Sequence, residues 1–310
     1  MLSSGKGAYH HVRRAVRAVV CLSVWLFGLL SGWSVQAEGV LRVAVINERV
    51  NTPSTTLAEM TDFYRRLGRQ LAQSGIELAP LQVVDSIDQL AALVKRREVD
   101  AFFEGTFATL DITHQNPDWQ PQLLMWRKGQ RDYYSVFFVR DSSPVQDLSD
   151  LSGSSIVFES ARSTSAFHLP RLVLEQAGYQ LLPEGQATHP PRYLLYRFAD
   201  SEENQAYWVE RGRADIGAFN NGDWDRLPAS LRQRLRIVGQ TPPVPRWLFT
   251  LDTRLPAAVQ NAARQALLQL MDHEDDRQAL LQASGVTRIE ALNEADIANL
   301  RHWSGVVYGH

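Results

Sequence analysis

The stretch that decides the fold is Tyr133–Gly178, which reads YYSVFFVRDSSPVQDLSDLSGSSIVFESARSTSAFHLPRLVLEQAG. Aromatic and β-branched residues predict a strand over Tyr134–Arg140, and a second, buried strand is predicted over Ser155–Glu159. After the hydroxyl triplet Ser163–Ser165 the hydrophobic period changes from two to 3.6, which predicts a helix. Gly178 suits the position that follows a helix C-terminus. A strand that leads directly into a helix is typical of α/β proteins.

The triplet Ser163, Thr164 and Ser165 allows two interpretations. The first N–H groups of a helix have no partner within the helix, and the helix dipole makes that end partly positive. Hydroxyl groups beside those N–H groups complete an anion site. In the simpler interpretation, one of the three residues is an ordinary N-cap.

The same region resembles a known family, the periplasmic solute-binding proteins of phosphate, phosphite and phosphonate transporters. The family carries a Tyr-x-Ser strand, a D-L-x-G element and an S-T-S-G sequence near a helix start. The corresponding residues here are Tyr133–Ser135, Asp150–Gly153 and Ser163–Ala166, and the resemblance extends from about Arg42 to the C-terminus.

The resemblance implies an α/β, type II periplasmic-binding-protein fold with two lobes. Each lobe is expected to be a mostly parallel sheet flanked by helices, with the ligand in the interlobe cleft. The first lobe would be discontinuous, formed by residues 38–137 and 243–310, and the second would be formed by residues 138–242. The implied function is capture of a small oxyanion-bearing ligand, such as a phosphonate or phosphate, for a membrane ABC permease.

The N-terminus has the pattern of a secretory signal peptide. Lys6, Arg13, Arg14 and Arg17 precede a 13-residue, mostly apolar run, Ala18–Leu30, which is too short for a comfortable transmembrane span. Small residues at 35 and 37 predict cleavage after Ala37 and a periplasmic location. An uncleaved membrane anchor is the alternative; a lipid anchor at Cys21 is disfavoured, because Val20 is larger than a lipobox prefers.

Cleavage after Ala37 would leave 28 basic and 34 acidic residues, a net charge of −6, and no cysteine. A mature chain without cysteine forms no disulfide and has neither thiolate chemistry nor a cysteine-based metal site. An acidic chain without a basic run also argues against a nucleic-acid partner. Attraction for an anion must then come from local dipoles and hydrogen-bond donors.

A strand over Val99–Phe103 precedes Glu104, Gly105 and Thr106. Ligands of open α/β sheets bind beyond the carboxyl ends of the strands. Gly105 would let the backbone approach a ligand and Thr106 offers a hydroxyl, although Gly105 could equally serve a tight turn. In the expected mechanism the two lobes close on the ligand, with Gly105 and Thr106 meeting it from the first lobe and Ser163–Ser165 from the second.

Asn220–Asp223 follow another predicted strand and form a polar turn, in which Asn220 is a candidate ligand contact. Tyr134 is a further candidate, from the Tyr-x-Ser strand. Two positions depart from the family: Ser86 stands in a loop where members often have Tyr, and counting back from Asp215 places Glu202 where the family has a ligand-binding His. A carboxylate there would repel a phosphonate or pair with a ligand ammonium, so a zwitterionic ligand is a second hypothesis.

The sequence shows no catalytic set, no cofactor motif and no metal-ligand spacing. A secreted serine hydrolase that uses Ser165 and His168 is the alternative from another class, but the G-x-S-x-G motif is missing. A sensory binding protein that presents its ligand to a membrane receptor would share the fold and the mechanism. A freely diffusing monomer suits either binding function.

Overall fold

The computed structural model describes residues 39–47, 53–161, 163–186 and 190–309. The predicted signal peptide, its cleavage after Ala37 and the question of an anchor at Cys21 all lie outside the described residues. Within the described ranges no helix combines the length and the apolar character needed to cross a membrane.

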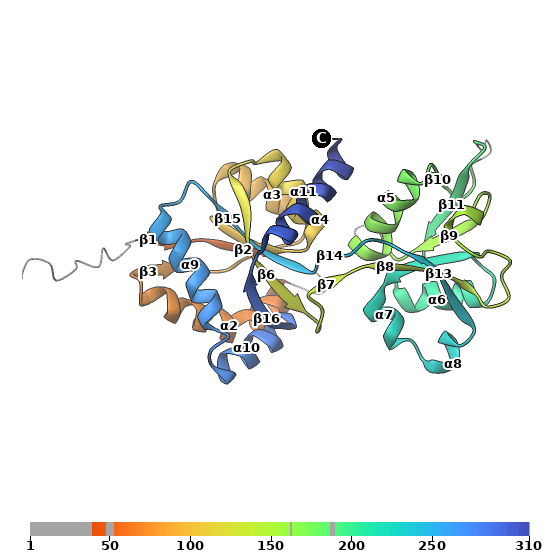
Figure 1. The fold of residues 1–310 in the computed structure, drawn as a ribbon. Helices are drawn as coiled ribbons and strands as arrows, with labels where there is room; N and C mark the ends of the chain where they lie inside the picture. The colour runs from red at the N-terminus through yellow and green to blue at the C-terminus, as the bar shows by residue number, and fades with distance from the viewer. Residues whose placement is uncertain (1–38, 48–52, 162, 187–189, 310) are drawn as a thin grey trace, which may run out of the picture. The chain divides into compact units, whose positions relative to one another are not determined.

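The first of two six-stranded sheets has the strand order β16-β6-β15-β5-β2-β4 (Figure 1). Its strands come from both ends of the described chain, since two of them follow residue 240. In chain order they are β2 (Val43–Ile46), β4 (Gln82–Val84), β5 (Ala101–Glu104), β6 (Trp119–Arg127), β15 (Trp247–Asp252) and β16 (Val286–Ala291). A short parallel pair lies apart from this sheet and is formed by β1 (Gly39–Leu41) and β3 (Ile76–Leu78).

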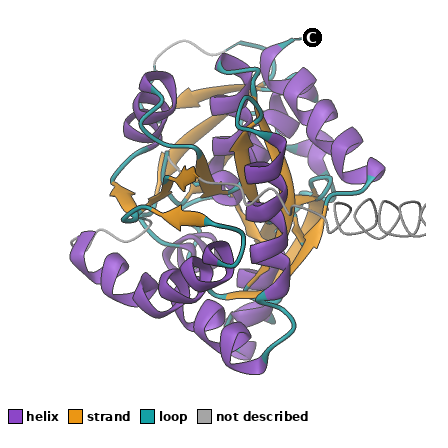
Figure 2. Ribbon diagram, turned by 90° about the vertical axis from the view of Figure 1, so that its left-hand side faces the viewer, coloured by secondary structure: helices purple, strands orange, loops and turns teal. Residues whose placement is uncertain are grey.

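Six helices of the described chain lie in the two segments that form the first sheet. Figure 2 shows purple helices on both sides of orange strands. In α2 (Pro53–Ala72), Phe63 and Leu67 lie on the apolar face and are buried. The helices are α2 (Pro53–Ala72), α3 (Ile87–Arg96), α4 (Thr106–Gln115), α9 (Ala257–Gln269), α10 (Glu274–Ser284) and α11 (Glu294–Tyr308).

The second six-stranded sheet has the order β10-β11-β9-β12-β8-β13 and draws on a single continuous segment. Its strands are β8 (Ser135–Arg140), β9 (Ser155–Phe158), β10 (Gln180–Pro183), β11 (Tyr193–Phe198), β12 (Ile216–Asn220) and β13 (Leu235–Gln240). The helices among them are the 3-10 turn η1 (Leu148–Asp150), the π-helix η2 (Thr164–His168), α5 (Leu169–Gln176), α6 (Glu202–Glu210), α7 (Asn221–Arg226) and α8 (Ala229–Arg232).

Both sheets are mixed. The expectation of a mostly parallel sheet holds for the second, in which β10, β11, β9 and β12 run parallel, and needs correction for the first. In the first, β4, β2 and β5 run parallel, whereas the pairings β15–β5, β15–β6 and β16–β6 are antiparallel. In the second, β8 is antiparallel to both β12 and β13. Two of the reversed strands, β8 and β15, are the first strands that the chain forms after each passage between the sheets.

The chain passes from the first sheet to the second between β6 and β8 and returns between β13 and β15. On the way it forms β7 (Asp132–Tyr133) and β14 (Val244–Pro245), which pair antiparallel (Figure 1). Pro242, Pro243 and Pro245 in the return segment favour an extended backbone. Because β8 lies wholly in the second sheet, residue 137 falls inside a strand rather than between sheets.

Several elements were not expected from the sequence. Helix α4 follows Gly105 directly, and β16 follows the left-handed Gly285 (φ 70°) at the end of α10. The final helix continues through Trp303, which is fully buried, to Tyr308. Helix α5 ends as predicted: its C-cap is Ala177, and Gly178 follows with a φ of 86°.

Candidate functional site

The hydroxyl triplet opens a continuous helical run from Thr164 to Gln176. Its first five residues form the π-helix η2, and α5 continues from Leu169. Ser163 is the N-cap, since its backbone is extended and its Oγ accepts a hydrogen bond from the N–H of Ala166 at 3.1 Å. The simpler interpretation of one residue in the triplet as an N-cap is therefore confirmed for Ser163, and Thr164 and Ser165 occupy the first turn.

Ser165 joins this helix start to the neighbouring strand. Its backbone carbonyl accepts a hydrogen bond from the Oγ of Ser135 at 2.6 Å, and both residues are buried. Ser135 is the first residue of β8, and its N–H donates to the Oγ of Thr241 at 2.9 Å. The triplet is thus held against both segments through which the chain enters and leaves the second sheet.

Glu159 is a residue that the sequence analysis did not single out. It follows β9 directly, and its backbone N–H donates to the carbonyl of Ala166 at 3.2 Å. Burial raises the pKa of the Glu159 carboxyl above its ordinary value, and the charges of Glu202 and Asp223 raise it further. The Ser163 hydrogen bond and the charge of Lys128 act in the opposite direction.

Asn220, Tyr134 and Asn221 form a second junction beside the triplet. Asn220 ends β12 and caps α7, because its Oδ1 accepts from the N–H of Asp223 at 3.1 Å. The predicted polar turn is therefore a helix start, which uses the same residues to satisfy the first N–H groups. The Asn221 N–H donates to the Tyr134 carbonyl at 2.9 Å, and the Tyr134 N–H donates to Asn221 Oδ1 at 3.3 Å. The same Oδ1 accepts from Gln130 Nε2 at 3.0 Å.

Gly105 and Thr106 stand at the start of α4, beyond the carboxyl end of β5. Gly105 is the N-cap with a φ of −66° and no side-chain cap, so it serves no left-handed turn. The expected role of the Thr106 hydroxyl needs correction: Thr106 is fully buried, and its Oγ1 donates to the carbonyl of Pro245 at 2.6 Å. Only the backbone of Thr106 is left for a ligand.

Helix α4 lies close to η2, and a hydrophobic cluster includes Leu110 of α4, Leu169 and Leu172 of α5, and Trp303 of α11. Arg246 follows Pro245 on the same crossing segment. Its carbonyl oxygen lies near Gly105, since a Cβ atom added at Gly105 would be 3.9 Å from it. The Arg246 guanidinium stacks over the Tyr133 ring at 4.2 Å, and its buried Nε has no hydrogen-bond partner among the described residues.

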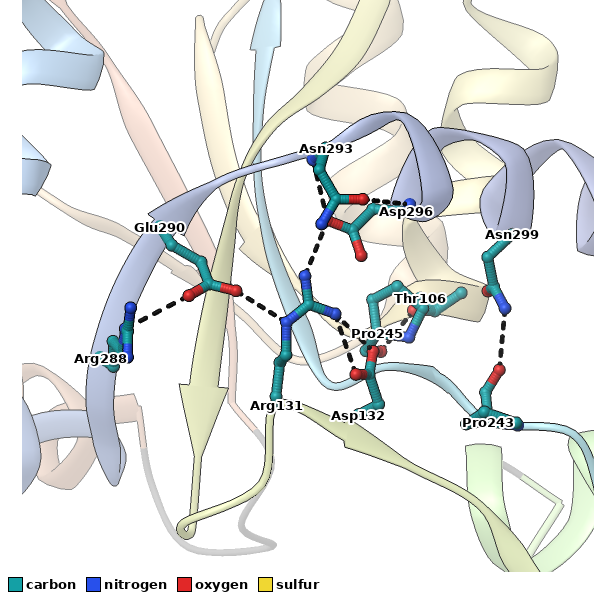
Figure 3. A network of polar contacts seen from close by, with 10 residues as sticks. All are labelled: Thr106, Arg131, Asp132, Pro243, Pro245, Arg288, Glu290, Asn293, Asp296 and Asn299. Atoms are coloured by element: carbon teal, nitrogen blue, oxygen red, sulfur yellow. Dashed lines mark hydrogen bonds and ion pairs between the residues drawn. The ribbon is translucent and has the colours of Figure 1, made fainter.

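The crossing segments are fixed to the first sheet by Arg131, as Figure 3 shows. Its guanidinium forms ion pairs with Asp132 at 2.9 Å, Glu290 at 2.7 Å and Asp296 at 2.8 Å. Burial acts to lower the pKa of Arg131, but the hydrogen bonds to these three carboxylates raise it well above its ordinary value. Asp296 also belongs to the capping box of α11 with Asn293, so the ion-pair network reaches that helix.

Glu202 and Ser86, the two departures from the family pattern, both stand at helix starts. Glu202 is the first residue of α6 after the N-cap Ser201, and it is half-buried. Ser86 caps α3 by accepting from the N–H of Gln89 at 3.2 Å. The hydroxyl of Ser86 is therefore used within its own helix.

The residues of the hydrolase alternative do not form a catalytic relay in this structure. Ser165 is buried and its backbone carbonyl accepts from Ser135, and a hydrogen bond between its hydroxyl and His168 is not found among the described residues. Burial and the charge of Arg171 lower the pKa of His168. Groups of three or more potential metal ligands are also not found among the described residues.

The comparison with protein families identifies residues 50–297 as matching the model of the periplasmic substrate-binding protein of phosphonate ABC transporters. The chain belongs to this family. Members of the family are periplasmic binding proteins that supply a membrane permease with a small-molecule substrate, and they are not enzymes. The comparison with curated proteins finds no match.

Among solved structures, XAC2383 from Xanthomonas citri is 28% identical and has a TM-score of 0.74, covering 86% of this chain and 97% of its own in the chloride-bound form. A second structure of that protein is bound to ATP. PhnD1 from Prochlorococcus marinus in complex with methylphosphonate is 18% identical, with a TM-score of 0.58 over 87% of this chain and 98% of that one. The aliphatic sulphonate binding protein SsuA from Escherichia coli is 14% identical, with a TM-score of 0.52 over 88% of each chain. These similarities place the phosphonate-family chain in the two-lobed type II fold.

Proposed function

We propose that this binding protein captures a small oxyanion, of the phosphonate or phosphate kind, and delivers it to an ABC permease. The observation that carries the proposal is the helix start at Ser163–Ser165, directly after a strand of a parallel part of the sheet. Backbone N–H groups at such a start bind anions, and hydroxyl side chains extend the donor set. In the sheet β9 lies between β11 and β12, so the chain after β9 continues first to one side and then to the other. Ligands of α/β proteins bind at the carboxyl ends of the strands at such a point.

In this proposal Ser163, Thr164 and Ser165 donate to the ligand from the second lobe, and Ser163 also caps the first turn. Tyr134 and Asn220 stand at the adjoining junction, where Asn221 ties them together. From the first lobe, the Gly105 backbone and the start of α4 approach the same place, and the Arg246 guanidinium supplies positive charge. We place the lobe boundaries at about residues 134 and 241, since β8 and β13 belong to the second sheet.

The ligands of the relatives agree with an anionic ligand. XAC2383 is described with chloride and with ATP, and PhnD1 with methylphosphonate. All three ligands are anions, which supports an anion site in this chain without deciding its size.

A ligand that carries an ammonium group is the second candidate, and a specific observation favours it. Glu202 opens α6 and Asp223 lies in the first turn of α7, and the charges of both raise the pKa of Glu159, so negative charge gathers near this residue. An ammonium group on the ligand would compensate that charge. If Glu202→Gln leaves the affinity for every amino-bearing ligand unchanged, this candidate is wrong.

A thermal-shift screen of the purified secreted protein tests the proposal. The panel contains phosphate, phosphite, methylphosphonate, aminoethylphosphonate, sulfate and several amino acids. A ligand at 100 times its dissociation constant adds about 2.7 kcal/mol to the free energy of unfolding, which raises the midpoint by several degrees. A rise with a phosphorus oxyanion is expected; no rise with any anion would contradict the proposal. Thr164→Val should abolish the rise, whereas Thr113→Val, on the distant half of α4, should not.

A further inference from the structure

The side-chain amide of Asn221 is fixed in one orientation at the start of α7. Its Oδ1 accepts from the N–H of Tyr134 at 3.3 Å and from Nε2 of Gln130 at 3.0 Å. A backbone N–H can only donate, so the atom that faces Tyr134 is the oxygen and the other end of the amide is Nδ2. Nδ2 carries two N–H donors, and neither has a hydrogen-bond partner among the residues that the structure describes.

Asn221 stands close to the hydroxyl triplet, because both are bonded to neighbouring residues of one segment. The Asn221 N–H donates to the Tyr134 carbonyl at 2.9 Å, and the Oγ of the next residue, Ser135, donates to the Ser165 carbonyl at 2.6 Å. Consecutive Cα atoms are about 3.8 Å apart, so these bonds hold the starts of η2 and α7 side by side. Strand β12, which leads into α7, also packs against η2. The Nδ2 donors therefore stand beside the helix start at which we propose the anion.

Gln130 reaches Asn221 from the other end of the crossing segment. It follows the tight turn between β6 and β7, in which residues 128 and 129 have φ values of 54° and 77°. The backbones of Gln130 and Arg127 exchange hydrogen bonds of 2.9 and 3.0 Å across this turn. Such a two-residue turn fixes the position of Gln130. Its side chain then spans residues 131–133 to reach α7.

The place of the Gln130 amide also depends on a glycine. A Cβ atom added at Gly222 would lie 3.0 Å from Gln130 Nε2, so the missing side chain leaves the room that this amide occupies. Gln130 and Asn221 are both half-buried, which limits the other positions that their side chains can take.

We infer that Asn221 is a further ligand-binding residue, whose Nδ2 donates to the oxyanion, and that Gln130 is the residue that positions this donor. Without Gln130 the amide keeps only the longer bond from Tyr134. Under the proposed lobe boundaries Gln130 belongs to the first lobe and Asn221 to the second, so the orientation of the donor depends on both lobes. This inference rests on the proposed oxyanion function and adds two residues to its site.

Titration calorimetry of the purified secreted protein with methylphosphonate tests the donor role. Asn221→Asp keeps an oxygen for Tyr134 and Gln130 but has no Nδ2, so its affinity should fall about 10- to 100-fold, as for a lost hydrogen bond to a charged group. Gln130→Ala should weaken binding about threefold to tenfold. Gln122→Ala is the matched control, because Gln122 is also half-buried and bonds a distant side chain, that of Arg264, at 2.6 Å. It should bind as the wild type does, and unchanged affinity in Asn221→Asp would overturn the inference.

A double-mutant cycle tests whether Gln130 acts through Asn221. In Asn221→Asp the donor that Gln130 would orient is gone, so the addition of Gln130→Ala should cost no further affinity. A loss of equal size in both backgrounds would show that Gln130 only supports the crossing segment, and would overturn its positioning role.

NMR of the wild type needs no variant. The two Nδ2 protons of Asn221, assigned through the backbone of the same residue, should shift as methylphosphonate is added, together with the backbone N–H signals of Thr164 and Ser165. Unchanged Asn221 protons beside shifting Thr164 and Ser165 signals overturn the inference but leave the proposed function standing. Failure of the wild type to bind methylphosphonate, phosphate, phosphite or sulfate overturns both.

Discussion

Two strand-to-helix junctions of this protein look alike in sequence but differ in structure. After β5 the chain turns at Gly105 into α4, and after β9 it turns at Ser163 into η2 and α5. At the first junction the hydroxyl of Thr106 is buried and bonded to the crossing segment. At the second, Ser163 is half-buried and its oxygen accepts from the N–H of Ala166. A hydroxyl at a helix start can thus anchor a distant segment or cap its own helix, and the partner it finds decides which.

The largest expected effect on stability concerns the ion pairs of Arg131. Arg131→Met leaves Asp132, Glu290 and Asp296 without their shared cation, and Asp296 is almost fully buried. Loss of one partner from a largely buried ion pair costs about 3 kcal/mol, and partial exposure of Arg131 brings the expectation to about 2 kcal/mol of the free energy of unfolding. Urea denaturation measures it.

Arg288→Met is the matched control for Arg131, because Arg288 also pairs with Glu290 but is mostly exposed. It should change the free energy of unfolding by less than about 0.5 kcal/mol. Equal losses in the two variants would contradict an anchoring role for Arg131.

The next effect separates the two buried hydroxyls of α4. Thr106→Val removes the hydrogen bond to Pro245 and leaves a buried carbonyl without it, so we expect a loss of about 1–2 kcal/mol. Thr109 is also fully buried, but its hydroxyl has no partner within the described chain, so Thr109→Val should be neutral or stabilising. Denaturant midpoints of the two variants check the comparison, which fails if Thr109→Val is the more destabilised.

Ser163→Ala tests the second junction, where we propose the ligand site. Loss of the N-cap should lower the free energy of unfolding by about 1 kcal/mol, and loss of the ligand donor should weaken oxyanion binding about tenfold. Ser86→Ala removes a similar cap from α3 and should match the stability loss with unchanged affinity. Equal oxyanion affinities of Ser163→Ala and Ser86→Ala would show that Ser163 is only a cap.

The smallest effect is the pH dependence of stability from Glu159. Its folded-state pKa lies above its ordinary value of 4.5, so the folded protein holds this proton more tightly than the unfolded chain. The resulting stabilisation is present below about pH 4.5 and is lost as the pH rises through the folded-state pKa. Glu159→Gln should therefore be more stable than wild type near neutral pH. Thermal midpoints measured across this range check the sign; a midpoint that falls in Glu159→Gln only at neutral pH would contradict it.

The sequence by itself determined the class of fold and the place of the candidate site. Changes of hydrophobic period marked the strand at Ser155, the helix after Ser163 and the end of that helix near Gly178, because these signals depend on local spacing alone. The motifs of the central stretch indicated the family, which the comparison then confirmed. The site residues of the triplet are neighbours in the chain, and so local sequence was enough to place them together.

Only the tertiary structure decided the mixed sheets, the helix after Gly105 and the partners of the hydroxyls. The direction of β8 and β15 depends on where the chain crosses between sheets, which no local pattern records. Pro245, the partner of Thr106, and Glu290 and Asp296, two partners of Arg131, lie more than 100 residues away in the chain. Glu159 was missed for a related reason: its neighbours Glu202 and Asp223 stand at the starts of other helices, and folding alone brings their charges to bear on it.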